Sequence, residues 1–249
     1  MIEDAVRVLV AARLLGERPD SLPSSAQPPD LATAHAIQDA TAAALGDPVA
    51  GWKVTISPAG EVMRGAVLQS RLLTSPAVLP TSLVPLLGIE TEIAFRFDTS
   101  LEPRQTHYTE AEVAAASTAV VAIEVVDSRF RSYKDAPLLD RTADCMSNGA
   151  LIIGTARPDW RGLDLAGLEA VLTVNGAETV RQTGGHVAGH PIGPAVKLVN
   201  ALRRESGVKA GQIITTGTFT GLVFVQPGDQ IVAEFTGFGR AEIRFEGGR

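Results

Sequence analysis

The sequence predicts an α+β fold in which an N-terminal helical segment, residues 1–47, precedes a β-rich domain at residues 48–249. Apolar residues recur at helical spacing in the first segment. Beyond it, many short runs of branched and aromatic residues are separated by turn residues, and few helices interrupt them. This order favours an α+β or mainly β fold over a doubly wound sheet, in which strands and helices would alternate.

Two helices are expected in the N-terminal segment, on either side of a loop that is rich in proline and serine. Residues 3–16 place apolar side chains at intervals of three and four, and Gly16 can end this helix. Asp30 can cap a second helix over residues 31–45, because its carboxylate can accept a hydrogen bond from a free N–H of the first turn. Gly46 can end the second helix in a left-handed conformation.

Short runs of β-forming residues mark the strands expected in the second domain, at residues 49–56, 77–79, 89–97, 119–126, 150–155, 170–174, 212–216, 223–225, 230–236 and 241–246. Asn175-Gly176 is a strong signal for a hairpin turn. Further helices are expected at residues 109–117, 165–168 and 193–206. The first of these opens on a capping box formed by Thr109 and Glu112, and Asp164 can cap the second.

The composition is that of an ordinary globular protein. With 249 residues, 45% of them hydrophobic and 20% charged, the chain can bury a full core. The net charge of −6 argues against a nucleic-acid surface, which would be basic. The N-terminus lacks the pattern of a signal peptide, and no run approaches the ~20 apolar residues that span a bilayer. Cys145 is the single cysteine, so we expect a cytoplasmic protein without disulfides and without nucleic-acid or membrane partners.

The most informative feature is the pair Glu90 and Glu92 inside the apolar run 87–95. The run is typical of a strand, and the two-residue repeat of a strand places both carboxylates on one face. Two interpretations are open at this point. The pair can be solvated on the polar face of an edge strand, as in many antiparallel sheets. Alternatively it can be buried around a divalent cation, because hard ions such as Mg²⁺ prefer oxygen ligands and remove the repulsion between carboxylates.

A second acidic cluster contains Glu124, Asp127 and Arg129. Glu124 lies in the apolar run 120–126, where an unpaired carboxylate would be costly. Three carboxylates from two strands are a common way to hold Mg²⁺ or Mn²⁺ while leaving positions open for a substrate. For Asp127 and Arg129, a local salt bridge or turn cap is the simpler interpretation.

A lysine and a hydroxyl-rich turn could contact an anionic substrate. Lys53 lies in a strand-like run, where it can either point to solvent or, if partly buried, have a lowered pKa and act as an acid or base. The segment around Thr216 offers hydroxyl and backbone N–H groups to a carboxylate, or it is an ordinary strand and glycine loop. His186 and His190 lie in a glycine-rich stretch typical of mobile loops, and their spacing does not indicate a metal site.

Together these pieces resemble the 2-oxopent-4-enoate hydratases and 2-oxo-3-hexenedioate decarboxylases of the fumarylacetoacetate hydrolase superfamily. The similar segments occur in the family's order and span about residues 30–245. They are Ala36-Ile-Gln38, Gly51-Trp-Lys53-Val, Ile89-Glu-Thr-Glu-Ile-Ala-Phe95, Ala122-Ile-Glu-Val-Val-Asp-Ser-Arg-Phe130, Ala143-Asp144, and Thr216-Gly217 followed by Val225-Gln-Pro-Gly-Asp229.

The resemblance implies a fumarylacetoacetate-hydrolase-like mixed β-roll and a homo-oligomer. It also implies that Glu90, Glu92 and Glu124 hold Mg²⁺ or Mn²⁺, and that a small 2-oxo acid or its dienol chelates this ion. Lys53 and Asp144 are then the candidate catalytic residues. The candidate substrate-binding residues are Arg129, Ser147 and Thr216.

Two segments depart from the family pattern. The family has an acidic residue in a Gln-Pro-Asp-x-Gly-x-Leu stretch, whereas the corresponding residues 65–73 contain neither Asp nor Glu. In the family's Ala-Asp-Asn-Ala-Ser-Ser-Gly segment, Asp144 and Ser147 match, but Cys145 and Met146 do not. The metal half of the site is therefore expected to be intact and the substrate half altered.

Three hypotheses follow. The leading one is a metal-dependent lyase that hydrates the alkene of a small 2-oxo acid or decarboxylates it. The second is an acylpyruvate-type C–C bond hydrolase, which would use a water activated by a His–Glu pair. His35 is the only histidine before residue 107, and it lies in an ordinary helical pattern, which places this hypothesis lower. The third is a catalytically idle homologue that binds a ligand.

Overall fold

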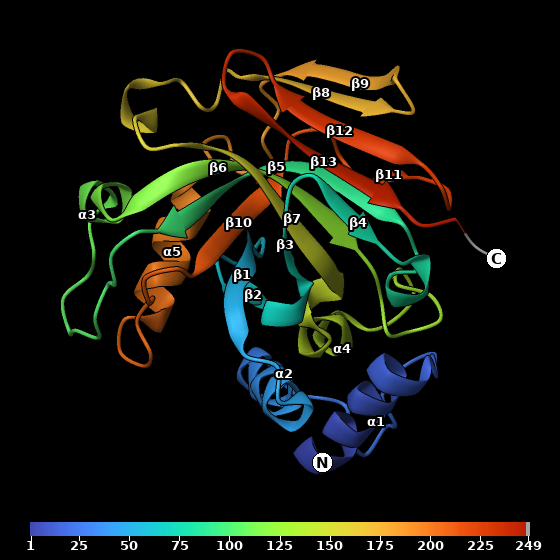
Figure 1. Ribbon diagram of the computed structural model, residues 1–249. Coiled ribbons are helices and arrows are strands. Elements are labelled where there is room, and N and C mark those ends of the chain that lie inside the picture. Colours follow the sequence, from blue (N-terminus) through green and yellow to red (C-terminus); the bar gives the residue numbers. More distant parts are fainter. Residues whose placement is uncertain (248–249) are drawn as a thin grey trace.

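The computed structural model describes residues 1–247 and contains two β-sheets with helices below and beside them (Figure 1). The larger sheet has its strands in the order β2 (Val62–Leu68), β1 (Val49–Ile56), β10 (Ile213–Thr218), β5 (Gly88–Phe97), β6 (Ser117–Val126), β7 (Asn148–Arg157) and β3 (Leu72–Thr74), with β11 (Val223–Phe224) paired to β5. The smaller sheet has the order β4 (Ala77–Leu79), β13 (Gly239–Phe245), β12 (Gln230–Phe235), β8 (Glu169–Val174) and β9 (Ala177–Thr183). The predicted α+β class and mixed β-roll are thus confirmed.

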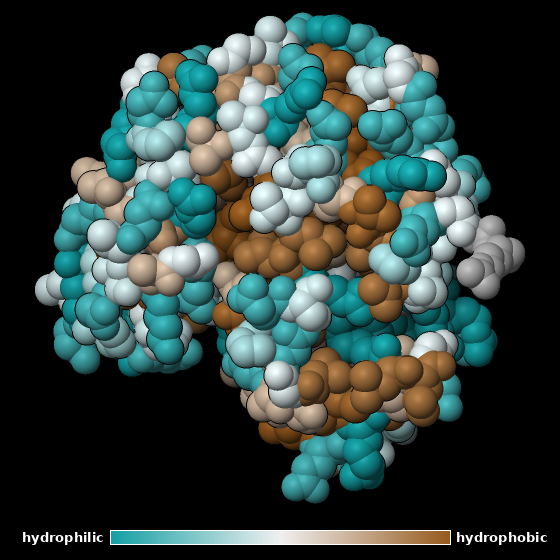
Figure 2. Space-filling view, viewed as in Figure 1, coloured by the Kyte–Doolittle hydropathy of each residue, from teal (hydrophilic) through white to brown (hydrophobic). Residues whose placement is uncertain are grey.

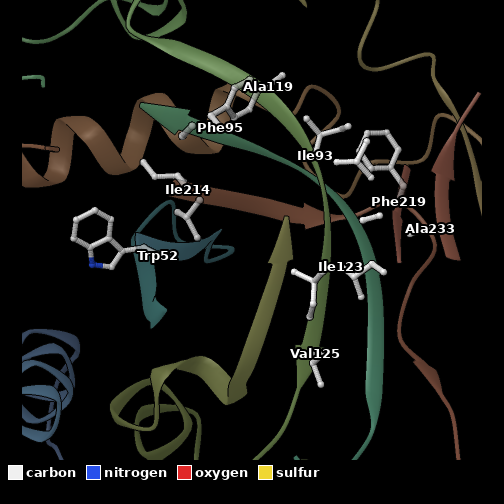
Figure 3. Close-up of a cluster of buried hydrophobic side chains, with 14 of the residues drawn as sticks. Trp52, Ile93, Phe95, Ala119, Ile123, Val125, Ile214, Phe219 and Ala233 are labelled. Carbon is white, nitrogen blue, oxygen red and sulfur yellow. The ribbon is translucent and has the colours of Figure 1, made fainter. Parts of the chain in front are cut away.

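The main core fills the space between the two sheets. Figure 3 shows Ile93, Ile123 and Val125 of the larger sheet in the same buried cluster as Phe219 and Ala233. Each large apolar side chain that is fully buried contributes roughly 1.5–3 kcal/mol relative to an exposed one. This face of β5 and β6 is therefore apolar, and their opposite face is free to carry polar groups.

The N-terminal helices α1 (Ile2–Leu15) and α2 (Leu31–Leu45) pack on each other below the larger sheet (Figure 1). The Asp30 carboxylate accepts a hydrogen bond from the N–H of Thr33, as expected of a cap, and Gly46 ends α2 with φ 64°. Leu9 and Ile37 are buried between the two helices. No helix within residues 1–247 is long and apolar enough to cross a membrane.

Three further helices connect the strands: α3 (Glu110–Ala115), α4 (Leu138–Ala143) and α5 (Ile192–Leu202). The capping box of Thr109 and Glu112 at the start of α3 is present. Asn175 and Gly176 form the turn between β8 and β9 with φ of 50° and 80°, and this left-handed pair is what an Asn-Gly hairpin turn requires.

The predicted helix at residues 165–168 is wrong. The chain forms a turn there, in which the Asp164 carboxylate accepts from the N–H of Gly167. Four residues are too few to offset the cost of nucleating an α-helix. The helix predicted at residues 193–206 ends instead at Leu202.

Candidate active site

Three glutamates converge on the face of the larger sheet that is opposite the main core. In the antiparallel pairing of β5 with β6, Glu90 lies directly across from Glu124, and Glu92 follows on the same face of β5. One carboxylate oxygen of each residue lies within 4.8 Å of the others. Glu92 and Glu124 are 1% and 0% exposed, and β5 lies inside the sheet between β10 and β6. The interpretation of a solvated pair on an edge strand is therefore wrong.

The proximity of the three carboxylates makes ionisation costly. Burial raises the pKa of Glu90 to about 7, with Lys53 opposing the shift and Glu124 adding to it. Burial, followed by the charges of Glu124 and Glu90, raises the pKa of Glu92 to about 8. Two like charges in a dry site repel strongly, so protonation relieves them when no cation is present.

The carboxylate of Glu92 is fixed by strand β10. It accepts hydrogen bonds from the Thr215 hydroxyl and, at 3.0 Å, from the backbone N–H of Gly217. Gly217 has φ 117°, and a Cβ at this position would lie 2.6 Å from a methyl carbon of Val187. Glycine is therefore required here both by the backbone conformation and by the close approach of the loop that contains Val187.

The Glu124 side chain is fully buried, and its two carboxylate oxygens have different surroundings. Its Oε1 atom accepts from the Lys53 ammonium at 2.7 Å and from the Asn148 amide at 3.0 Å. Its Oε2 atom is buried and has no hydrogen-bond partner among residues 1–247. A buried carboxylate oxygen without a partner is costly, and a divalent cation would satisfy it. The oxygen-only donor set fits a hard ion such as Mg²⁺ or Mn²⁺.

Lys53 points from β1 toward the glutamates and is 15% exposed. Burial alone would lower its pKa, but the charges of Glu124, Glu90 and Glu92 outweigh burial, and the pKa is raised. The expected lowering is therefore wrong, because the lysine is surrounded by carboxylates and not by apolar groups. Its neighbour across the sheet is Gly65, where a Cβ would lie 2.8 Å from the Lys53 side chain.

A cleft of about 610 Å³ lies between β1, α5 and the loop that contains Val187, and the glutamates are not among its lining residues. It is lined by Thr55, two residues beyond Lys53 on β1, and by Thr216, which follows Thr215 on β10. Lys197 of α5 and Val187 form its other walls. Val187 links this cleft to the cluster, because it packs against Gly217, whose N–H donates to Glu92.

His186 lies next to Thr216, which lines the cleft. Its Nε2 atom lies 3.5 Å from the Thr216 hydroxyl, and its ring packs 5.0 Å from the ring of Phe219. Burial lowers the pKa of His186 to about 4, so the imidazole is neutral at neutral pH. A neutral imidazole here can accept or donate a hydrogen bond within the site.

The other predicted site residues lie in a separate buried network. Arg129 donates from its backbone N–H to the Asp144 carboxylate at 2.9 Å and from its guanidinium to the Asp144 carbonyl at 2.9 Å. The Ser147 carbonyl accepts from the N–H of Asp127. Within the described chain, no hydrogen bond or ion pair joins Arg129, Asp144 or Ser147 to the three glutamates. The network instead fixes the turn that leads into Asn148.

Sequence reasoning did not single out Thr215, Asn148 or Lys197 as site residues. Side chains alternate between the two faces of strand β10, so Thr215 and Thr216 point to opposite faces of the sheet. This alternation was a signal that Thr215 could face the glutamates. Asn148 follows Ser147 in the matched family segment, which placed it one residue from a candidate. Lys197 had no such signal, since its position depends on how α5 packs beside β1.

The chain belongs to the fumarylacetoacetate hydrolase family. Residues 42–246 match the family model described as fumarylacetoacetate (FAA) hydrolase C-terminal. This match covers the sheets and all three glutamates, and it agrees with the family resemblance noted in the sequence.

Among characterised relatives, the chain is similar to decarboxylases and hydratases. It is 33% identical to a 4-oxalocrotonate decarboxylase of Pseudomonas putida over 158 residues, which is 63% of this chain and 59% of that protein. The matched region thus spans less than two thirds of the decarboxylase. A 2-keto-4-pentenoate hydratase of Paraburkholderia phymatum is 28% identical over 228 residues, covering 87% of this chain and 86% of the hydratase.

Among solved structures, 4-oxalocrotonate decarboxylase from Pseudomonas putida G7 superposes with a TM-score of 0.84 and 25% identity, covering 98% of each chain. That protein was crystallised with magnesium and adipate, and a second structure of it contains calcium and acetate. A fumarylpyruvate hydrolase from Pseudomonas aeruginosa is 15% identical with a TM-score of 0.59, and it shares the fold.

Proposed function

We propose that this protein is a divalent-metal-dependent lyase that acts on a small 2-oxo acid or its dienol, by hydration of the alkene or by decarboxylation. The observation that carries the proposal is the cluster of Glu90, Glu92 and Glu124, with Lys53 beside it. The similarity to hydratases and decarboxylases over most of the chain supports it.

Glu90, Glu92 and Glu124 would hold Mg²⁺ or Mn²⁺. When bound, such an ion supplies Lewis-acid polarisation of a carbonyl and stabilises negative charge that develops on its oxygen. The chain itself orients the ligands: Thr215 and Gly217 fix the Glu92 carboxylate, and Asn148 fixes that of Glu124. Loss of a hydrogen bond of this kind to a metal ligand typically lowers metal affinity or activity by roughly 10–100-fold.

Lys53 would bind the substrate carboxylate and move a proton. Its ammonium already donates to Glu124, so a substrate anion beside the glutamates would meet a cation that is held in place. The hydroxyl of Thr216 and the imidazole of His186 would complete the wall next to the substrate carbons. A proton donor and acceptor near these carbons are what tautomerisation of a dienol requires.

Asp144, Arg129 and Ser147 remain in the proposal as residues that act on this reaction. Asp144 is 1% exposed and its carboxylate is engaged by Arg129. This supports a positioning role, in which the pair holds the turn that presents Asn148 to Glu124. Replacement of Asp144 would then change metal affinity through Asn148.

We further propose a cytoplasmic homo-oligomer. Leu14 and Leu15 at the end of α1 are each 69% exposed, and exposed apolar groups of this kind are typical of subunit contacts. In Figure 2 the part of α1 that is in view carries a hydrophobic band. The single cysteine, Cys145, is buried as a free thiol, which fits a reducing compartment.

The geometry favours the lyase over the C–C bond hydrolase. His35, the histidine that the hydrolase hypothesis would need, accepts a hydrogen bond at 3.2 Å from the backbone N–H of Arg64. Burial lowers its pKa to about 4. His35 thus lies on α2 and is held by the backbone of β2, whereas the glutamates lie on β5 and β6.

The test is an assay of the purified protein with a panel of 2-oxo acids and dienols of increasing chain length. Turnover is measured as the loss of dienol absorbance. Turnover is expected with Mg²⁺ or Mn²⁺ and absent after chelation. Analysis of released CO₂ against hydrated product separates decarboxylation from hydration. Full activity in EDTA would contradict the proposal, and metal binding without any turnover would favour an idle ligand-binding homologue.

A further inference from the structure

A second polar cavity, of about 360 Å³, lies between the end of α1 and the body of the protein. Four arginines line it: Arg13 of α1, Arg18 in the loop after α1, Arg71 after β2 and Arg129 after β6. In Figure 2 hydrophilic surface separates the apolar surface of α1 from that of the main body. Arg13 and Arg18 belong to α1 and the loop after it, and Arg71 and Arg129 belong to the body, so the arginines come from both sides of this junction.

The carboxylates around the cavity do not balance these charges. Asp127 accepts from Arg18 at 2.9 Å and lies 3.7 Å from Arg129, and Asp144 pairs with Arg129. Arg13 lies 3.5 Å from the same Asp144 carboxylate. Asp127 and Asp144 are thus shared among Arg13, Arg18 and Arg129, and even with Asp47, whose charge acts on Arg71, positive charge is in excess.

Two of the guanidinium groups have donors without acceptors. The Nε atom of Arg13 and an Nη atom of Arg71 are buried and have no hydrogen-bond partner within residues 1–247. The side chain of Arg13 is only 9% exposed. Its Nη2 atom contacts the sulfur of Cys145 at 3.3 Å, and burial raises the pKa of that thiol, so the sulfur does not supply the missing charge. A buried ionic donor without an acceptor is costly, and arginine cannot escape this cost by losing its proton at ordinary pH.

We propose that this cavity binds a small dianionic oxyanion, a phosphate or a dicarboxylate, through Arg13, Arg18 and Arg71. The guanidinium fork presents parallel N–H donors that match carboxylate and phosphate oxygens, so both ligands share one recognition chemistry. The negative charges of such a ligand would offset the local excess, and its oxygens would give acceptors to the free donors.

The cavity is distinct from the proposed lyase site. Four arginines line this cavity, whereas the lyase site is built on three glutamates, and the cavity shares no lining residue with the cleft of Thr55 and Thr216. Strand β7 begins between them, since the Asn148 side chain contacts Glu124 while Gly149 lines the arginine cavity. A bound anion would join α1 and its loop to the body, so it would hold the N-terminal helix in place.

The experiment uses the full chain, freed of metal and then of chelator, so that the glutamate site cannot bind anions through a cation. Phosphate and succinate are titrated in separate arms at constant ionic strength, with sodium chloride as the balancing salt. Binding is followed by calorimetry and by Tm. We expect a saturable rise in Tm of a few degrees, because a ligand that binds only the native state stabilises it by mass action.

Arg71→Gln should weaken binding roughly tenfold or more, because it removes a charged hydrogen-bond donor. Arg18→Gln is a second variant on a different element and should also weaken binding. The matched control is Arg7→Gln, which removes an exposed arginine of α1 outside the cavity and should leave affinity unchanged. Ligand should also slow proteolysis within residues 1–30 in the wild type.

A saturable response to one anion alone supports the proposal and identifies the ligand class. The absence of a saturable response to either anion would overturn it. Equal weakening in Arg7→Gln, or unchanged affinity in both Arg71→Gln and Arg18→Gln, would also overturn it. None of these measurements uses metal or turnover, so the result does not depend on the lyase proposal.

Discussion

The glutamate cluster and the arginine cavity are both buried groups of like charge, but they relieve their repulsion in different ways. The cluster has three carboxylates and one lysine, and protonation can remove its excess charge, as the raised pKa values of Glu90 and Glu92 indicate. The arginine cavity cannot lose protons in this way, because guanidinium stays protonated. The cluster should therefore respond to pH and cations, and the cavity to anions.

The two regions also differ in how they are built. The glutamates lie on adjacent strands, where the register of β5 against β6 sets their separation. The arginines come from four separate segments around the junction with α1. A site within one sheet is rigid before any ligand binds, whereas a site across a junction can gain order from its ligand.

The largest expected effect comes from Glu92→Gln. The amide keeps the size of the side chain but removes one anionic ligand, so turnover should fall by more than roughly 100-fold, since even outer-shell changes cost 10–100-fold. At the same time the metal-free protein should become more stable at pH 8, because one buried like charge is gone. Assays with Mg²⁺ and thermal unfolding without metal measure the two effects.

The control for this prediction is Glu234→Gln, which changes an exposed glutamate of β12. It should alter neither turnover nor stability. A Glu92→Gln protein with wild-type metal affinity would show that Glu92 is not a ligand.

Lys53→Met should give the next largest effect. It removes the ammonium that pairs with Glu124 and leaves the carboxylates without a cation. Breaking a buried ion pair by removing one partner costs about 3–5 kcal/mol. The loss should be greatest at pH 8 without metal and smaller at pH 5, where the neighbouring glutamates can be protonated. Urea unfolding at the two pH values measures it, with exposed Lys209→Met as the control.

The metal-free protein should lose stability as pH rises from about 4.5 to about 8. Glu90 and Glu92 have raised pKa values in the folded state, so the native protein binds more protons than the unfolded chain across this window. Stability therefore falls by several kcal/mol as these protons are released. Unfolding of the metal-free protein across this range checks the sign.

Added Mg²⁺ or Mn²⁺ should stabilise the protein most at the alkaline end of this range, because metal ligands must be deprotonated. Equal stabilisation by the metal at pH 5 and pH 8 would argue against binding at the glutamates. The Glu92→Gln variant should show a weaker pH dependence than the wild type.

The sequence predicted most strands, and the placement of Glu90 and Glu92 on one face of a strand, because these depend on local pattern. That the pair holds a metal together with Glu124 was implied by the family resemblance and not by the pattern. Strand β9, Ala177–Thr183, was missed because its residues are mostly polar and exposed, so it lacks alternation. Strand β2, Val62–Leu68, was missed because it is buried on both faces, and a glycine and an arginine interrupt it. Such strands are defined by their neighbours and not by their own period.

The parts of the site that depend on three-dimensional packing could not be predicted. The direction of the Lys53 pKa shift required knowing that three carboxylates surround it. The contact of Arg13 with Asp144 joins residues far apart in the chain, and no spacing rule relates them. The arginine cavity therefore could not be predicted from the sequence, because it forms only when these distant segments pack together.

The smallest expected effect is the counterpart of Glu92→Gln in the arginine cavity. Arg71→Gln removes one positive charge from a region with an excess of them, so it should stabilise the protein at low salt by about 1 kcal/mol or less. This gain should be the same at pH 5 and pH 8, since guanidinium does not titrate there, and should shrink when phosphate is added. Chemical unfolding at two pH values and two phosphate concentrations measures it. A gain that followed pH as Glu92→Gln does would mean that the two clusters are electrostatically coupled.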